Sequence, residues 1–171
     1  MAASVLRAHE VGQPSLCAVL ERFGLRPAFV PAGMPIPGSY WGDEEAGLQL
    51  DTLYYRDDTP LHSILHEACH YACMSAVRRH ELNTDAGGDD LEECAVCYLQ
   101  VLCADALPQL GAARMLRDMD AWGYSFRLGS ARRWFEEDAD DARARLERAG
   151  LIDAKRRPTW RLRAGRGAED T

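Results

Sequence analysis

Residues 60–74 read PLHSILHEACHYACM, and this stretch limits the fold and the chemistry more than any other part of the chain. Pro60 suits the first position of a helix, and Asp58 or Thr59 just before it can cap that helix. Apolar side chains recur at the spacing of one helix face, at Leu61, Ile64, Leu65, Ala68 and Ala72. The sequence therefore predicts a helix that packs against a hydrophobic core.

Two histidines of this predicted helix, His66 and His70, are four residues apart. They share one face, so both imidazoles can reach one ion. Glu67 projects about 100° away from His66, where it can act as general base for a bound water. The pattern His-Glu-x-x-His is the sequence signature of zinc metallopeptidases of the zincin type. The alternative is a surface helix that carries these residues by chance.

A catalytic zinc ion usually takes a third protein ligand and a water. A second predicted helix starts at Asp89 or Asp90, either of which can serve as its N-cap. Glu92 and Glu93 lie in its first turn, and a helix packed across the first one can bring one of them to the ion. The alternative is an acidic first turn that only complements the helix dipole.

The order of a strand, the His-Glu-x-x-His helix, a short linker and a second helix resembles the minimal gluzincins, notably the ImmA/IrrE-like metallopeptidases. The resemblance covers residues 47–108. In these families the second helix supplies a glutamate ligand, and a small residue follows it three positions later. Glu92 with Ala95 fits this pattern, and Glu93 with Val96 fits it less well.

The resemblance implies a zinc-dependent peptidase in which His66, His70 and Glu92 bind Zn²⁺ and Glu67 is the catalytic base. It also implies that a strand beside the cleft binds an extended peptide or protein substrate. One position departs from the family pattern. Val96 stands where an Asp or Asn usually orients a ligand. This departure leaves a second hypothesis open: a catalytically inactive metal-binding or partner-binding protein derived from a metallopeptidase.

Other side chains with relevant chemistry have more than one possible role. His62 is too far along the helix axis from His70, about 12 Å, for one ion to bind both as well as His66. We expect His62 to line the cleft or to be a polar residue of the first turns. The donor for a tetrahedral oxyanion has four unranked candidates: Tyr124, Tyr98, His62 and His80.

The cysteines offer a competing metal site. Cys69 with Cys73, and Cys94 with Cys97, have spacings that could form a thiolate zinc or iron–sulfur centre. Buried cysteines are also common packing residues in helix cores, and we favour that interpretation. Cys73 is predicted to face the same side as the two motif histidines, so its thiol could lie next to the ion.

The rest of the pattern predicts an α+β fold that is zincin-like, with a small, mostly antiparallel sheet packed on the His-Glu-x-x-His helix and further C-terminal helices. The alternation over 48–54 indicates a strand, paired in a hairpin with residues 40–41. Helices are expected over 15–23, 109–122 and 130–149, with an extended segment over 26–34 and a polar connection over 79–88.

Length and composition predict one domain, residues 1–154, followed by a basic and mobile tail, residues 155–171. The net charge of −7 argues against a nucleic-acid-binding surface. Without an apolar run long enough to span a membrane, or a signal peptide, the expected location is cytoplasmic with reduced cysteines. Lys155 is the only lysine among 20 basic residues, a bias typical of GC-rich bacterial genomes.

Overall fold

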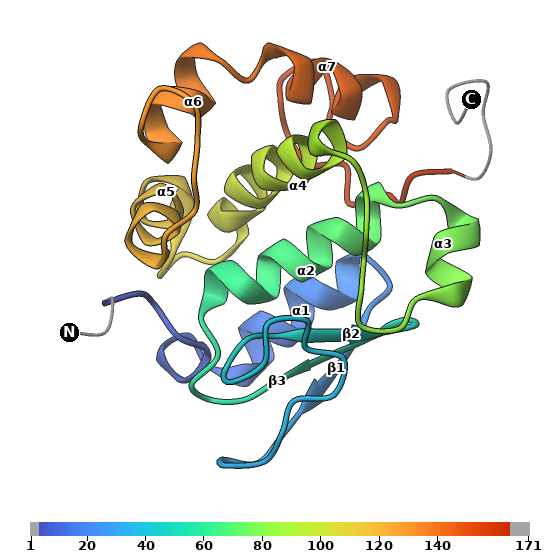
Figure 1. Cartoon of the computed structure of the whole chain (residues 1–171), viewed down its shortest axis with the longest axis vertical. Helices are drawn as coiled ribbons and strands as arrows, with labels where there is room; N and C mark the ends of the chain where they lie inside the picture. The colour runs from blue at the N-terminus through green and yellow to red at the C-terminus, as the bar shows by residue number, and fades with distance from the viewer. Residues whose placement is uncertain (1–3, 165–171) are drawn as a thin grey trace.

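The computed structural model describes residues 4–164, and within this range the protein is α+β. Three strands form one sheet: β1 (Arg26–Phe29), β2 (Gly47–Gln49) and β3 (Thr52–Tyr55). The α-helices are α1 (Gln13–Arg22), α2 (Leu61–Cys73), α3 (Ala76–Glu81), α4 (Asp90–Cys103), α5 (Gly111–Trp122), α6 (Ala131–Glu137) and α7 (Asp140–Arg148). Figure 1 shows how they are arranged.

The sheet is mixed, with strand order β1-β3-β2. β1 pairs with β3 in parallel and β2 pairs with β3 in antiparallel fashion, so the prediction of a mostly antiparallel sheet holds for one of two pairings. The strand predicted over 48–54 is broken at Leu50, whose φ of 53° turns the chain back on itself. The hairpin therefore lies within that segment. Its predicted partner region contributes only a bridge from Ser39 to Gly47.

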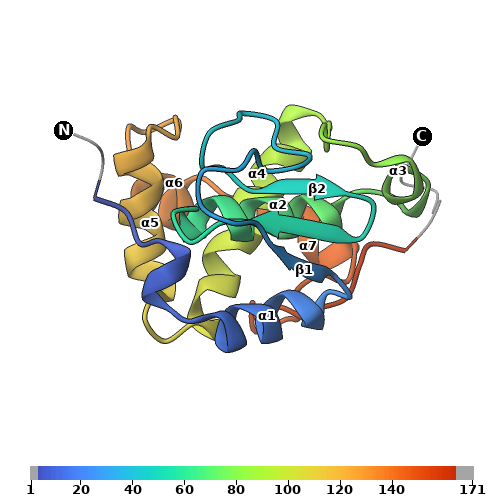
Figure 2. The ribbon, with the colours of Figure 1, turned by 90° about the horizontal axis from the view of Figure 1, so that it is seen from below.

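Helix α2 lies between the sheet and helix α4, and it contacts both. Figures 1 and 2 show the sheet on one side of α2 and α4 crossing on the other. Because both sides are covered, eleven of its thirteen residues are buried, including the polar His62 and Ser63. The sequence pattern predicted an apolar stripe on one face only. A helix packed on two sides holds its histidines in a fixed direction, which a metal site requires.

Helices α2 and α4 differ in how their N-termini are capped. α4 begins as predicted, because the Asp89 carboxylate accepts a hydrogen bond from the backbone N–H of Glu92 at 2.8 Å. α2 begins at Leu61 with Pro60 in the N-cap position and no side-chain cap. The Thr59 hydroxyl instead accepts a hydrogen bond from the backbone N–H of Arg56. The predicted capping of α2 by Asp58 or Thr59 is therefore wrong.

Further helices follow the sequence pattern less closely. The predicted helices over 15–23 and 109–122 correspond to α1 and α5. The helix predicted over 130–149 is divided into α6 and α7 at Asp138 and Ala139. The connection predicted over 79–88 instead begins within α3, whose N-cap Ser75 accepts from the Arg78 N–H. Within residues 4–164, no helix has the length and apolar character needed to cross a membrane.

The described part of the basic C-terminal segment is packed on the domain. The Trp160 ring lies 4.9 Å from that of Phe23, and the Arg22 guanidinium is 3.9 Å from the Trp160 ring centroid. The backbone N–H of Arg163 donates to the carbonyl of Ala72 at the end of α2. Trp160 and Arg163 of the predicted tail thus contact the domain, and residues 165–171 lie outside the described residues.

Candidate metal centre

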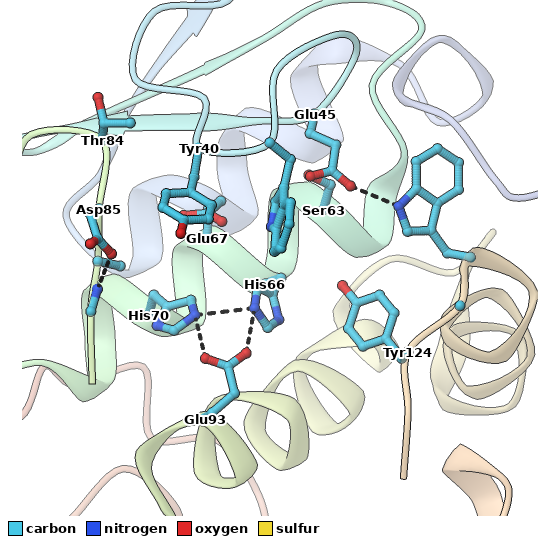
Figure 3. Close-up of a pocket in the computed structure, with 15 residues that line it drawn as sticks. Tyr40, Glu45, Ser63, His66, Glu67, His70, Thr84, Asp85, Glu93 and Tyr124 are labelled. Atoms are coloured by element: carbon cyan, nitrogen blue, oxygen red, sulfur yellow. Dashed lines mark hydrogen bonds and ion pairs between the residues drawn. The ribbon is translucent and has the colours of Figure 1, made fainter. Parts of the chain in front are cut away.

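The two motif histidines and one glutamate converge at a single point. The Nε2 atoms of His66 and His70 are 3.1 Å apart. The carboxylate of Glu93 reaches both, with Oε1 at 2.9 Å from His66 Nε2 and Oε2 at 3.0 Å from His70 Nε2. Figure 3 shows the three side chains facing one another, the histidines from α2 and the glutamate from α4. Within residues 4–164, this is the group of His, Cys, Asp or Glu side chains that could hold a metal ion.

The distances fit a small tetrahedral ion. Two ligand atoms bound at 2.0–2.1 Å to a tetrahedral zinc ion lie about 3.3 Å apart. The two imidazole nitrogens are 3.1 Å apart, so they need to open by only a few tenths of an ångström, and a different Glu93 oxygen faces each of them, at 2.9 and 3.0 Å. Two imidazole nitrogens and a carboxylate oxygen are also a ligand set that zinc accepts.

The glutamate at this point is Glu93, not Glu92. Glu92 is 3% exposed and faces three guanidinium groups. Its Oε2 lies 2.8 Å from Arg78 Nη1 and 3.6 Å from Arg145 Nη2, with Arg163 Nη1 at 3.8 Å. The third ligand expected from the family pattern is therefore corrected by one residue. One position along a helix is a rotation of about 100°, so both glutamates cannot face the histidines.

The electrostatics of the cluster favour an ionised carboxylate. Burial opposes the charged form of Glu93, but hydrogen bonds from His66 and His70 outweigh it and hold the pKa well below its usual range. Burial likewise disfavours a charged His66. Its contacts with Tyr124, Cys97 and Glu93 overcome that effect and raise the pKa of His66. The Glu93 carboxylate is therefore ionised, and its negative charge faces the two imidazole nitrogens.

A buried amide supports His66 from behind, and sequence reasoning missed it. Gln100 Oε1 lies 2.9 Å from His66 Nδ1, and Gln100 Nε2 donates to the carbonyl of His62 at 2.9 Å. Gln100 follows Glu93 by seven residues, so both lie on the face of α4 that meets α2. The periodic spacing was the available signal. The spacing points to Gln100 only when it is counted from Glu93, the glutamate that faces the histidines.

Glu67 lies beside His66, His70 and Glu93, which we call the metal-ligand cluster, in a cleft of about 530 Å³. Figure 3 shows Glu67 on the opposite side of the histidines from Glu93. Burial raises the pKa of Glu67, an effect that His66 and His70 partly offset. The cleft also contains Tyr40 and Trp41, and Trp41 is 74% exposed at its rim.

Of the four side chains considered as oxyanion donors, Tyr124 is the one that lines the cleft. Its hydroxyl is 3.1 Å from His62 Nδ1, and its ring lies 5.7 Å from that of His66. Burial raises the pKa of Tyr124 to about 12, which keeps the hydroxyl protonated. Tyr98 is buried against Phe135, and His80 lies on α3 outside the cleft.

His62 has a supporting position instead. It is 1% exposed and packs against Trp122 and Tyr124. Burial, helped by the nearby charges of His66 and Arg7, lowers the pKa of His62 to about 3. It is therefore neutral at neutral pH and sits one helical turn from the metal-ligand cluster.

The thiols do not form a second metal site within the described residues. All six cysteines are free. Cys69 contacts Cys103 in the core between α2 and α4, and burial raises the pKa of both Cys69 and Cys73. High thiol pKa values disfavour the thiolate that binds metal. Packing is the interpretation that fits these positions.

The free edge of the sheet is taken by the chain itself. The N–H of Thr84 donates to the carbonyl of Leu48, and the N–H of Leu50 donates to that of Leu82, both at 3.0 Å. The segment then continues along the cleft, where residues 84–87 form one wall. This pairing occupies part of the β2 edge, and the binding of an extended substrate beside the cleft stays a prediction.

Neither a protein-family model, nor a curated protein, nor a solved structure matches this chain. The family resemblance accordingly rests on the short motifs themselves.

Proposed function

We propose that this protein is a zinc-dependent peptidase in which His66, His70 and Glu93 bind the ion. The observation that carries the proposal is the convergence of two imidazole nitrogens and one carboxylate on a single point beside a cleft, with Glu67 adjacent. Three protein ligands leave the fourth position of a tetrahedral ion for water or substrate, as in catalytic rather than structural zinc sites. A zinc ion there would lower the pKa of its water toward about 7 and polarise the scissile carbonyl.

The residues around the cluster have the properties that peptide hydrolysis needs. The Glu67 carboxylate takes the proton of the attacking water and passes a proton to the leaving amine. Its raised pKa suits both steps, because a carboxyl that holds a proton more readily can also deliver it. The Tyr124 hydroxyl, on the same cleft wall as His66, donates a hydrogen bond to the carbonyl oxygen as negative charge develops there.

The test is peptide cleavage by the purified protein with zinc present and after zinc removal. A diverse peptide mixture, followed by mass spectrometry, reports cleavage of many sequences at once, so that no single substrate has to be chosen. We expect new peptide ends that depend on zinc and disappear with a chelator. Zinc binding with no cleavage of any peptide would instead favour the metal-binding protein without catalysis.

A further inference from the structure

Gln100 is a polar side chain at the centre of an apolar interface. It is fully buried, with 0% exposure, between α2, α4 and α5. Its neighbours on α4, Leu99 and Val101, are apolar and also fully buried. An amide in such a place is costly unless its polar atoms find partners. Each end of the Gln100 amide has a partner, and the two partners determine what the amide does.

The hydrogen bonds of Gln100 determine where the proton of His66 lies. The carbonyl of His62 can only accept, so the Gln100 NH₂ group must face it, at 2.9 Å. The amide oxygen, which can also only accept, then faces His66 Nδ1 at 2.9 Å. That contact is a hydrogen bond only if Nδ1 carries a proton. In a neutral imidazole with the proton on Nδ1, the Nε2 lone pair is free to bind a metal.

We propose that Gln100 is a positioning residue that holds His66 as the Nδ1–H tautomer and turns its Nε2 lone pair toward His70 and Glu93. The metal-binding part of this inference rests on the proposed function, whereas the tautomer does not. His70 has no equivalent support, because its buried Nδ1 has no hydrogen-bond partner among residues 4–164. His66 is therefore the pre-oriented ligand of the pair.

The same helix face supplies both the ligand and the support. Glu93 and Gln100 are seven residues apart on α4, which is about two helical turns. The first reaches the Nε2 side of His66 and the second reaches its Nδ1 side. Two side chains of α4 therefore contact the His66 imidazole, one at each ring nitrogen.

Zinc affinity, measured by competition with a chromogenic chelator, tests the metal-binding part. We expect Gln100→Leu to raise the zinc Kd about 10- to 100-fold, the usual effect of removing an orienting partner. Gln100→Glu keeps an acceptor at His66 Nδ1 but loses the N–H that the His62 carbonyl accepts, so it should recover only part of the affinity. Val101→Ala, at the adjacent buried position, is the matched control. It should weaken folding without changing the zinc Kd.

The tautomer is tested in metal-free protein by ¹⁵N NMR of the histidines at alkaline pH, where the ring is neutral. The signals of His66 are assigned by their absence in His66→Ala. We expect one tautomer with the proton on Nδ1 in the unmodified protein, and a mixture in Gln100→Leu. A proton on Nε2, or a Gln100→Leu variant with unchanged tautomer and unchanged zinc Kd, would overturn the inference.

The two measurements separate this inference from the proposed function. A chain that shows the Nδ1–H tautomer but binds no zinc would refute the peptidase proposal and leave the positioning role of Gln100 standing. A chain that binds zinc, but in which Gln100→Leu changes neither the tautomer of His66 nor the zinc Kd, would refute the positioning role of Gln100 and leave the peptidase proposal standing.

Discussion

Glu92 and Glu93 are neighbours in the sequence, but their carboxylates serve different parts of the molecule. Glu93 lies 2.9 Å from His66 Nε2 in the open cleft, whereas Glu92 lies 2.8 Å from Arg78 Nη1 in a buried charge cluster. The two side chains differ by one helical step, which is about 100° around α4. This relationship predicts that one glutamate governs metal binding and the other governs stability.

Glu93→Ala should abolish tight zinc binding and leave the fold intact, because its carboxylate is half exposed and supplies one ligand. Glu92→Ala should instead lower the free energy of unfolding by about 1–3 kcal/mol, since it removes the buried carboxylate that three partly exposed guanidinium groups share. Zinc titration and urea unfolding of both variants measure the two effects. If Glu92→Ala remained folded but lost zinc, while Glu93→Ala kept zinc, the ligand assignment would be wrong.

Glu67→Gln should retain zinc and lose turnover. The substitution keeps the size of the side chain but removes the group that accepts the proton of the attacking water. General-base catalysis of this kind contributes about 10²–10⁴-fold to a rate. Zinc content and peptide cleavage are measured on the same preparation. Cleavage at the unmodified rate would remove Glu67 from the mechanism.

Tyr124→Phe should lower kcat about 10²–10³-fold with little change in KM, because its hydroxyl acts on charge that develops only in the transition state. Tyr98→Phe is the matched control, since Tyr98 is buried against Phe135 and does not line the cleft. Steady-state kinetics on a cleaved peptide measure both. Equal effects of the two substitutions would argue against a role for Tyr124 in catalysis.

His62 should make stability depend on pH. Its pKa is lowered to about 3 in the folded protein, whereas the unfolded chain has the ordinary value of about 6.5. Below about pH 6.5, protons therefore bind His62 in the unfolded chain but not in the folded protein, and the free energy of unfolding falls as the pH decreases. The contribution of this one group is about 2 kcal/mol between pH 6.5 and pH 5.

Urea unfolding of the metal-free protein at several pH values measures this effect without interference from zinc release. A His62→Asn variant should lose less stability over the same interval, because asparagine does not titrate. Parallel pH profiles for the two proteins would exclude His62 as the source.

The sequence was sufficient for much of the site, because helical periodicity constrains residues close together in the chain. His66, His70 and Glu67 could be located relative to one another from spacing alone, and the start of α4 followed from the Asp89 cap. What periodicity cannot determine is how one helix is rotated against another. That rotation depends on tertiary packing, which is why Glu93 rather than Glu92 reaches the histidines.

Contacts between distant segments were beyond the reach of the sequence pattern for the same reason. The pairing of Thr84 with Leu48 joins residues on either side of α2, and no local signal marks it. The turn at Leu50 is hidden in the sequence because apolar/polar alternation continues through it, although a left-handed leucine breaks the strand there. The pattern of β1 likewise indicates an extended segment but not its parallel pairing with β3.

The measurement that tests the central claim most directly is zinc content by elemental mass spectrometry on protein purified without a histidine tag. His66→Ala and Cys94→Ala variants are measured alongside. The structure predicts about one zinc per chain, as a single three-ligand site requires, lost in His66→Ala and kept in Cys94→Ala. No zinc even after reconstitution, or zinc lost only in Cys94→Ala, would contradict the assignment of His66, His70 and Glu93 as the metal centre.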